Sequence, residues 1–359
     1  MLILSLRMKG RMTRMSEARR VETEINWNGK RVDAILTGHL ESVSYVDCAK
    51  DASDTIDITV ENIDMNWMSG WYPKKGDKLD CMFNFTNWDY EGNDWEVDCG
   101  RFTLDDMSFI GGSKTMQISA VALPASNSFS VRKRVKTWKK ITLRKIGKTI
   151  SKRYGLKYKY NGPKITVATL EQDEESDMQF MYKICKKYGL GMKIYNEKLV
   201  IFDPGKMEQK AAVLAFTPQH FINGNWSFND SLDGVYNGAR INYKSGGEES
   251  SETKSVYFGK VKEKSKKART LKVSETARSR ADAKYIACAA INASNEDATT
   301  ISGDVWPNEK LVAGVCIELQ NFGKASGKYM IDKLTINTTA GGSTYSIEAH
   351  KCVKRLRRV

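Results

Sequence analysis

The chain has 359 residues, enough for two or three domains of ordinary size. Hydrophobic residues make up 41% of it and charged residues 28%, as in globular proteins generally. No apolar run approaches the roughly 18 residues that span a bilayer, so we expect no membrane insertion. The seven cysteines form no C-x-x-C pair and the three histidines are scattered, which argues against a disulfide framework and a metal site.

The formal net charge of +14 is unevenly distributed along the chain. Residues 131–170 hold fourteen Lys or Arg and no acid, whereas residues 21–130 hold 19 Asp or Glu against 8 Lys or Arg. Both ends of the chain are basic, and we interpret residues 1–20 as a basic N-terminal arm. Such asymmetry indicates surfaces that meet different partners.

Residues 21–125 have the pattern of an all-β domain. In the stretch DTIDITVENI, Ile56, Ile58 and Val60 alternate with polar residues, which is the period of a half-buried strand. Residues 78–123 then predict three strands separated by two polar, glycine-containing turns. Several short strands at this spacing are typical of a β-barrel or a β-sandwich.

Residues 126–206 change to an α/β pattern, in which the similar phrases ISKRYGL and ICKKYGL occur. Thr142 can cap one helix and Ser176 a second. Gly155 and Gly189 suit the left-handed position that ends a helix, so each phrase predicts a helix end followed by a strand. After the second phrase, GMKIY and KLVIF predict a hairpin. The likeness is either convergent capping or a two-copy module, and the sequence leaves both open.

Residues 207–359 return to a β pattern. They predict two strands around a Gly-containing turn, then a helix near 275–293, and finally a closing hairpin. The predicted stripe of this helix consists of Ala277, Ala281, Cys288 and Ile291, widened by Ala287. The whole pattern predicts a mainly β chain with an α+β insert, that is, two β-barrel domains that flank a small α/β domain.

Motifs of catalysis and cofactor binding are absent from the sequence. The nearest approach to a phosphate-binding loop is GKT at 147–149, where Thr142 stands in the place of the first glycine. Neither H-E-x-x-H nor G-x-S-x-G occurs. Acidic groups at 105–106 and 173–175 are of the kind that a glycosidase uses, but such groups are also common at strand ends and helix starts. We therefore expect no enzymatic activity, no catalytic residue, no cofactor and no metal.

The basic segment 131–164 supports an alternative hypothesis of nucleic-acid binding. Its cations would follow the phosphates while its aromatic side chains stack on bases. The interleaved aromatic residues are Trp138, Tyr154, Tyr158 and Tyr160. Against this hypothesis, the acidic residues 21–130 would repel the same backbone. A solvated basic face without any partner is a further alternative.

Three stretches, in order over about residues 20–355, carry a family resemblance. They are DCGRFTLDDMSF at 98–109, EESDMQFMYKICKKYGLGMKIYNEKLVIFDP at 174–204 and LVAGVCIELQNFGKASGKYMIDKLTINTTAGGSTYSIEAHKC at 311–352. Together they resemble the late-control D proteins, the baseplate hub proteins of contractile phage tails. That family is related to the base of type VI secretion spikes and to the hubs of contractile bacteriocins.

The resemblance implies a structural function. Hubs of this family are homotrimers with two tube-forming barrel domains per subunit, and their ring adapts the hexameric tail tube to the central spike. The implied partners are two further copies, the tail tube protein, the central spike protein, and baseplate wedge or other hub proteins. DNA would pass through the lumen at most transiently. The implied location is the cytoplasm of the producing bacterium during assembly and then the baseplate of a phage tail or bacteriocin. A tail-associated cell-wall hydrolase is a further alternative.

The predicted regions are a basic arm at 1–20, a first β-barrel at 21–125, an α/β domain at 126–206 and a second β-barrel at 207–359. We expect segment 131–164 on the outside of the ring, because in the lumen its charges would repel one another and retain passing DNA. The residues expected to contact an acidic wedge or spike-associated protein are Arg132, Lys133, Arg134, Lys136, Lys139 and Lys140.

Overall fold

The computed structural model describes residues 18–32, 38–112, 114–123, 128–245 and 252–356. Strands account for 52% of the structure and helices for 17%, which confirms the prediction of a mainly β chain with a smaller helical part. Within the described ranges, no helix is long and apolar enough to cross a membrane. Most of the basic arm expected at 1–20 lies outside the described residues.

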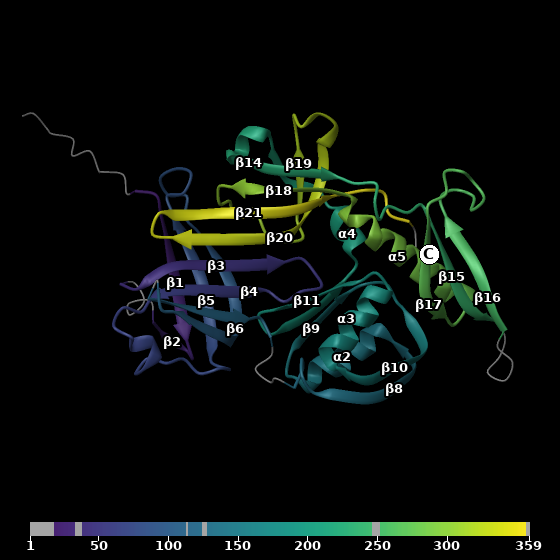
Figure 1. Ribbon diagram of the computed structural model, residues 1–359, viewed down its shortest axis with the longest axis horizontal. Coiled ribbons are helices and arrows are strands. Elements are labelled where there is room, and N and C mark those ends of the chain that lie inside the picture. Colours follow the sequence, from purple (N-terminus) through teal and green to yellow (C-terminus); the bar gives the residue numbers. More distant parts are fainter. Residues whose placement is uncertain (1–17, 33–37, 113, 124–127, 246–251, 357–359) are drawn as a thin grey trace, which may run out of the picture.

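A thirteen-stranded sheet draws its strands from both ends of the chain (Figure 1). From the first part come β1 (Arg20–Trp27), β2 (Lys30–Arg31), β3 (Leu40–Cys48), β4 (Thr55–Glu61), β5 (Lys78–Thr86), β6 (Trp95–Ile110) and β7 (Thr115–Val121). From the last part come β13 (Ala212–Phe216), β14 (Phe221–Asp230), β18 (Thr299–Val305), β19 (Cys316–Leu319), β20 (Gly327–Thr339) and β21 (Gly342–Lys351). The predicted strands of residues 78–123 and the predicted closing hairpin, β20–β21, are therefore present.

The two expected barrel regions are joined through one strand pair. The order of the sheet is β14-β18-β21-β20-β3-β4-β7-β6-β5-β1-β2; β19 also pairs with β20, and β13 pairs with β19. Strand β20 pairs antiparallel with β3, so that Thr335 lies opposite Val46. The first core, which this sheet encloses, combines Phe83 and Phe85 with Tyr329 and Tyr345, so both ends of the chain fold together.

The α/β part consists of two small sheets and two helices. Its elements are β8 (Lys133–Thr142), α2 (Leu143–Arg153), β9 (Lys157–Asn161), β10 (Thr166–Ser176), α3 (Asp177–Lys187), β11 (Gly191–Tyr195) and β12 (Lys198–Phe202). Strands β8 and β10 form an antiparallel ribbon, and β12 lies between β11 and β9. The predicted hairpin is β11–β12, and β9 runs parallel to β12.

The predicted start and end of each helix of the α/β part are confirmed. The Thr142 hydroxyl accepts a hydrogen bond from the Lys145 N–H at 3.3 Å. Ser176 makes a reciprocal capping box with Gln179. Gly155 has φ 68°, and Gly189 in the second phrase has φ 60°. Each YGL phrase thus leads from a helix into a strand beside β12, but the two strands run in opposite directions.

A further small sheet lies within residues 207–359, beside the strands that belong to the large sheet. Strands β15 (Gly238–Ser245), β16 (Glu252–Gly259) and β17 (Thr270–Ala277) leave the large sheet and carry α5 (Arg280–Ser294). The predicted strand pair β14 and β15 exists, but each strand pairs in a different sheet. Ile241 and Ile286 of this unit share the second core with Ile184 and Met192 of the α/β part.

Helix α5 begins later than predicted. Ser279 caps it by accepting a hydrogen bond from the Asp282 N–H at 3.1 Å, so the first helical residue is Arg280. Ala277 therefore belongs to β17, and Ala281 is exposed. The buried face consists of Ala283, Ile286, Ala287, Cys288, Ala289 and Ile291. Single turns complete the fold: α4 (Pro204–Glu208), η1 (Asn66–Met68), η2 (Pro218–His220), η3 (Glu296–Ala298) and η4 (Gly323–Ala325).

Candidate protein-interaction surface

The six basic residues expected to contact a partner lie on or next to β8. Arg132 directly precedes the strand, and the other five belong to it. Arg132, Lys133, Lys136, Lys139 and Lys140 are exposed, whereas Arg134 is half-buried. Five of the six side chains are therefore exposed, with Lys133 and Lys139 on one face of β8 and Lys136 beside the Trp138 ring on the other.

Arg134 faces a buried carboxylate instead. Its Nε atom lies 3.1 Å from Oδ2 of Asp177, which also forms an ion pair with Arg153. Tyr154 Oη donates to Asp177 at 2.6 Å and Gln172 Nε2 donates at 2.9 Å. Burial opposes ionisation of Asp177, but these hydrogen bonds and Arg153 hold its pKa below the ordinary value. Arg134 thus anchors β8 to the start of α3.

The aromatic residues of the basic segment are not arranged as a stacking surface. Trp138 is buried and stacks on Phe180, with ring centroids 6.3 Å apart and an interplanar angle of 10°. Tyr154, Tyr158 and Tyr160 pack against the second core. These rings therefore stabilise the α/β part. They do not form the exposed stacking surface on which the nucleic-acid hypothesis depended.

Strand β8 has an acidic neighbour along one edge. Its partner β10 carries Glu171, Asp173, Glu174 and Glu175. Glu171 lies opposite Thr137, two positions from Lys139. Among the described strands, none pairs with the other edge of β8. Figure 1 shows β8 along the lower rim of the α/β part, outside β10.

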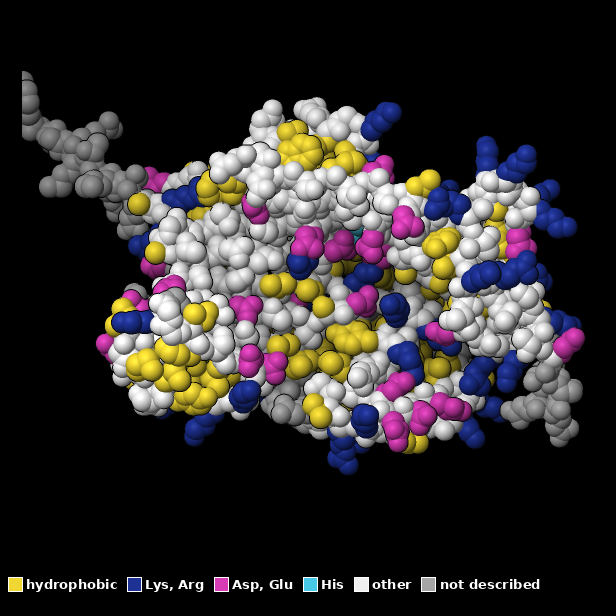
Figure 2. All heavy atoms as spheres, viewed as in Figure 1, with side chains coloured by type: hydrophobic (Ala, Val, Ile, Leu, Met, Phe, Trp, Pro, Cys, Tyr) yellow, Lys and Arg dark blue, Asp and Glu magenta, His cyan; other side chains and the backbone are white. Residues whose placement is uncertain are grey.

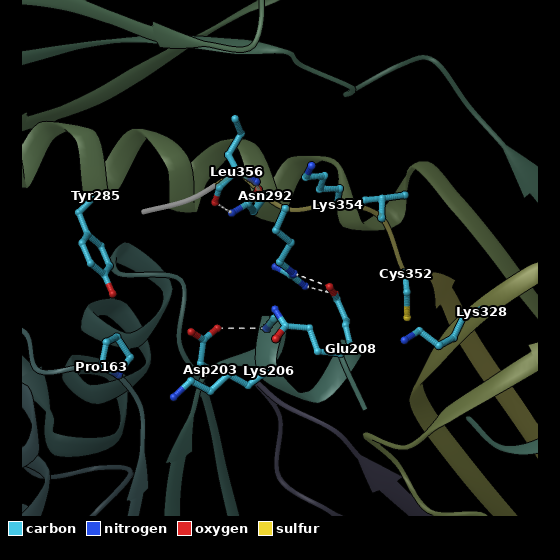
Figure 3. Close-up of a pocket in the computed structure, with 14 residues that line it drawn as sticks. Pro163, Asp203, Lys206, Glu208, Tyr285, Asn292, Lys328, Cys352, Lys354 and Leu356 are labelled. Carbon is cyan, nitrogen blue, oxygen red and sulfur yellow. Dashed lines mark hydrogen bonds and ion pairs between the residues drawn. The ribbon is translucent and has the colours of Figure 1, made fainter. Parts of the chain in front are cut away.

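A second charged cluster, which the sequence did not reveal, borders a cleft of about 700 Å³ (Figure 3). Glu208 of α4 accepts from Nε of Arg355 at 2.7 Å. His350 of β21, which is 1% exposed, lies 2.9 Å from Oε1 of Glu208 through Nε2. Its Nδ1 lies 2.7 Å from Oδ2 of Asp332. The partners are far apart in the sequence, so no spacing motif could have indicated the cluster.

The charges of this cluster depend on one another. Burial opposes protonation of His350, but hydrogen bonds to Asp332 and Glu208 raise its pKa to about 9. Burial likewise opposes ionisation of Glu208, but His350 and Arg355 lower its pKa to about 2. At neutral pH the imidazole is therefore a cation that bridges two carboxylates.

Three side chains of the cluster, Glu208, Glu296 and His350, place donor atoms within 4.8 Å of one another. Arg355 and Lys50 already neutralise the carboxylates, with Lys50 Nζ 2.7 Å from Oε1 of Glu296. A protonated imidazole is not a metal ligand. The set therefore suits a structural ion network that ties α4, η3, β21 and the C-terminal tail together.

Comparison with solved structures shows which known proteins share this fold. No protein-family model and no curated protein matches the chain. The 43 kDa tail protein of prophage MuSo2 from Shewanella oneidensis aligns with a TM-score of 0.67 at 13% identity, over 92% of this chain and 98% of that chain. The tail protein from Neisseria meningitidis MC58 aligns with a TM-score of 0.67 at 11% identity, over 92% and 97%.

A third solved structure extends the likeness to secretion machinery. It is a component of the E. coli type VI secretion system, described as similar to the T4 bacteriophage tail proteins gp27 and gp5. It aligns with a TM-score of 0.51 at 10% identity, over 96% of this chain and 80% of that chain. At such identities the likeness concerns the fold alone. The chain has the fold of phage tail proteins, in agreement with the resemblance to tail baseplate hubs that its sequence carries.

Proposed function

We propose that the chain is a structural baseplate hub of a contractile tail, from a phage or a phage-tail-like bacteriocin. The observation that carries this proposal is the likeness to a prophage tail protein over 92% of this chain and 98% of the other. It covers the large sheet and the α/β part together, as expected if the whole chain performs one structural task. The hub would be a homotrimer that joins the hexameric tail tube to the central spike.

The distribution of charge supports an orientation within such a ring. The acidic residues 21–130 form much of the large sheet, whereas segment 131–164 belongs to the α/β part. Lys and Arg side chains also gather around β15–β17, at the right of Figure 2. We infer that the large sheet lies nearer the lumen, where acidic side chains keep DNA from adhering, and that the basic part lies outside.

Electron microscopy of purified particles tests the proposed function. The expected result is three copies of the chain between the tail tube and the spike, with the large sheet toward the axis. Six copies at this level, or a tail without the chain, would contradict it. The two alternatives have separate tests, since a nucleic-acid-binding protein would bind DNA with a steep salt dependence and a hydrolase would clear peptidoglycan in a zymogram.

A further inference from the structure

Strand β8 has a free edge along the surface of the molecule. It pairs with β10 over residues 133–142, and none of the described strands occupies the opposite edge. Successive residues of a strand direct their N–H and C=O groups to alternate edges. About half of the backbone groups of β8 therefore face solvent in the form that another strand can pair with.

The side chains beside this edge include unusual exposed valines. Val135, the third residue of the strand, is 77% exposed, and Val131, two residues before the strand, is 70% exposed. Side chains of a strand alternate between its two faces. Lys133, Val135, Thr137 and Lys139 therefore share the outer face of β8. An added strand would cover the apolar side chains and place its own alternate residues beside the lysines.

The charge of β8 specifies the chemistry of that strand. Its paired edge already faces an acidic strand, since β10 carries four carboxylates between Glu171 and Glu175. None of the ion pairs formed among the described residues uses Lys133, Lys139 or Lys140. A strand with the acidic character of β10 would provide the missing counter-charges on the open edge.

Other occupants fit this edge less well. A second copy of β8 would bring two sets of lysines together, and like charges on adjacent strands repel each other. A nucleic acid would not use the open N–H and C=O groups or the exposed valines, and the segment's aromatic rings pack against the second core. An acidic polypeptide satisfies the backbone, the apolar positions and the charge at once.

We propose that the open edge of β8 binds an extended acidic segment of another protein by strand addition. This inference deepens the proposed function, because it states how the basic segment would contact a neighbouring component of the particle. The inference rests on the proposed function only in one respect, namely that the acidic segment belongs to a component of the particle.

The first experiment uses the full chain and a synthetic ten-residue peptide of alternating glutamate and valine. Hydrogen exchange of the β8 amides is followed with and without the peptide. We expect slower exchange at alternate residues of β8, and no such effect from a peptide with lysine in place of glutamate. Binding without any protection in β8 would overturn strand addition, as would stronger protection by a single-stranded DNA oligonucleotide.

Charge variants provide matched controls. Lys133→Glu with Lys139→Glu should weaken peptide binding by about tenfold or more, because each new carboxylate faces a like charge. Lys157→Glu with Lys159→Glu alters the net charge equally but lies on β9, and it should leave the affinity within about twofold. Equal losses in both variants would show that only net charge matters and would overturn the inference.

Proline variants test the backbone directly. Val135→Pro and Lys136→Pro remove neighbouring N–H groups that point to opposite edges, so one of them removes a donor from the open edge. Circular dichroism and thermal unfolding identify the variant that keeps the β8–β10 pairing. In that variant the peptide should no longer slow exchange in β8, and unchanged protection would overturn the inference.

A particle with the chain at the hub and nothing along β8 would also overturn the inference, while the proposed function would stand. Tails that lack the chain would refute the proposed function even if the peptide binds.

Discussion

At the scale of single residues, His350 illustrates how the interior holds charge. Carboxylates approach it from several elements: Asp332 from β20, Glu208 from α4 and Glu296 from η3. The cations Arg355 and Lys50 compensate the remaining negative charge. A buried charge is tolerated when it is paired and hydrogen-bonded in this way.

The pH dependence of stability should report this arrangement. Because the folded-state pKa of His350 is raised from 6.5 to about 9, its contribution is fully present below about pH 6.5 and is lost as the pH rises through 9. We expect His350→Gln to reduce the free energy of unfolding most at pH 6, by roughly 3 kcal/mol relative to its effect at pH 10. Urea unfolding across this range measures the difference. His220→Gln, at an exposed position, is the control, and a difference that grows with pH would contradict the assignment.

Replacement of Arg134 should lower the free energy of unfolding more than replacement of a neighbouring lysine. Replacement by Gln leaves Asp177 buried with one cation fewer, so we expect the free energy of unfolding to fall by about 1–3 kcal/mol. Lys133→Gln, at an exposed position on the same strand, should change it by less than about 0.5 kcal/mol. Chemical denaturation of both variants decides the matter. Equal effects would mean that the pair with Asp177 adds no stability.

The sequence predicted residues whose function is local. The caps Thr142 and Ser176 and the helix-ending Gly155 depend on neighbours within a few positions, so pattern alone identified them. The clusters around Asp177 and His350 join residues that are far apart in the chain. No periodicity relates such partners, and only the folded chain brings them together.

At the scale of elements, the position of β14 depends on a glycine in its neighbour. A Cβ atom on Gly303 of β18 would lie 2.7 Å from the backbone oxygen of Asn225 and 2.5 Å from Cδ1 of the Phe221 ring. A backbone contact of this kind cannot be relieved by rotation of a side chain. Glycine therefore allows β14 to bulge between Phe221 and Trp226 and still pair with β18.

Gly303→Ala should therefore release part of β14. We expect a loss of about 1–3 kcal/mol in the free energy of unfolding and faster amide exchange in residues 221–230. Gly70→Ala is the matched control, because a Cβ atom there meets nothing within 4 Å. An unchanged exchange rate in β14 would mean that the contact relaxes at no cost.

Elements with strong local signals and the hairpins β11–β12 and β20–β21 were predicted, whereas pairings between strands distant in the sequence were not. The alternation of Ile56, Ile58 and Val60 predicted β4, and all three side chains are buried. The pairing of β14 with β18 rather than β15 left no such signal, because most side chains of β14 are exposed and the strand has no clear apolar alternation. The start of α5 was misplaced since Ala277 is as compatible with a buried strand as with a helix.

At the scale of the whole molecule, ion pairs join the large sheet to the α/β part. Lys193 of β11 lies 3.1 Å from Asp54 and also pairs with Asp47 at the end of β3. A further ion pair, between Lys50 and Glu296 of η3, ties the end of β3 to the segment that follows α5. Strands β3 and β20 also pair although they are almost 300 positions apart, and no local pattern in the sequence indicates a pairing over such a separation.

The exposed lysines of β8 lead to a prediction about assembly. Four exposed lysines of the strand, Lys133, Lys136, Lys139 and Lys140, are replaced together by glutamate. If they contact an acidic component of the baseplate, the reversed charges repel it, and we expect far fewer complete tails by electron microscopy. The isolated variant should keep its fold, because these side chains are exposed.

A second fourfold reversal separates a specific contact from net charge. Lys262, Lys264, Lys266 and Lys267, between β16 and β17, are also exposed, and their replacement by glutamate lowers the net charge of the chain equally. Tails should assemble normally with this variant if β8 is the contact. Normal assembly with both variants would exclude a docking role for β8, and failure with both would trace the defect to overall charge. High salt during assembly should imitate the β8 variant by screening the exposed lysines of the native chain.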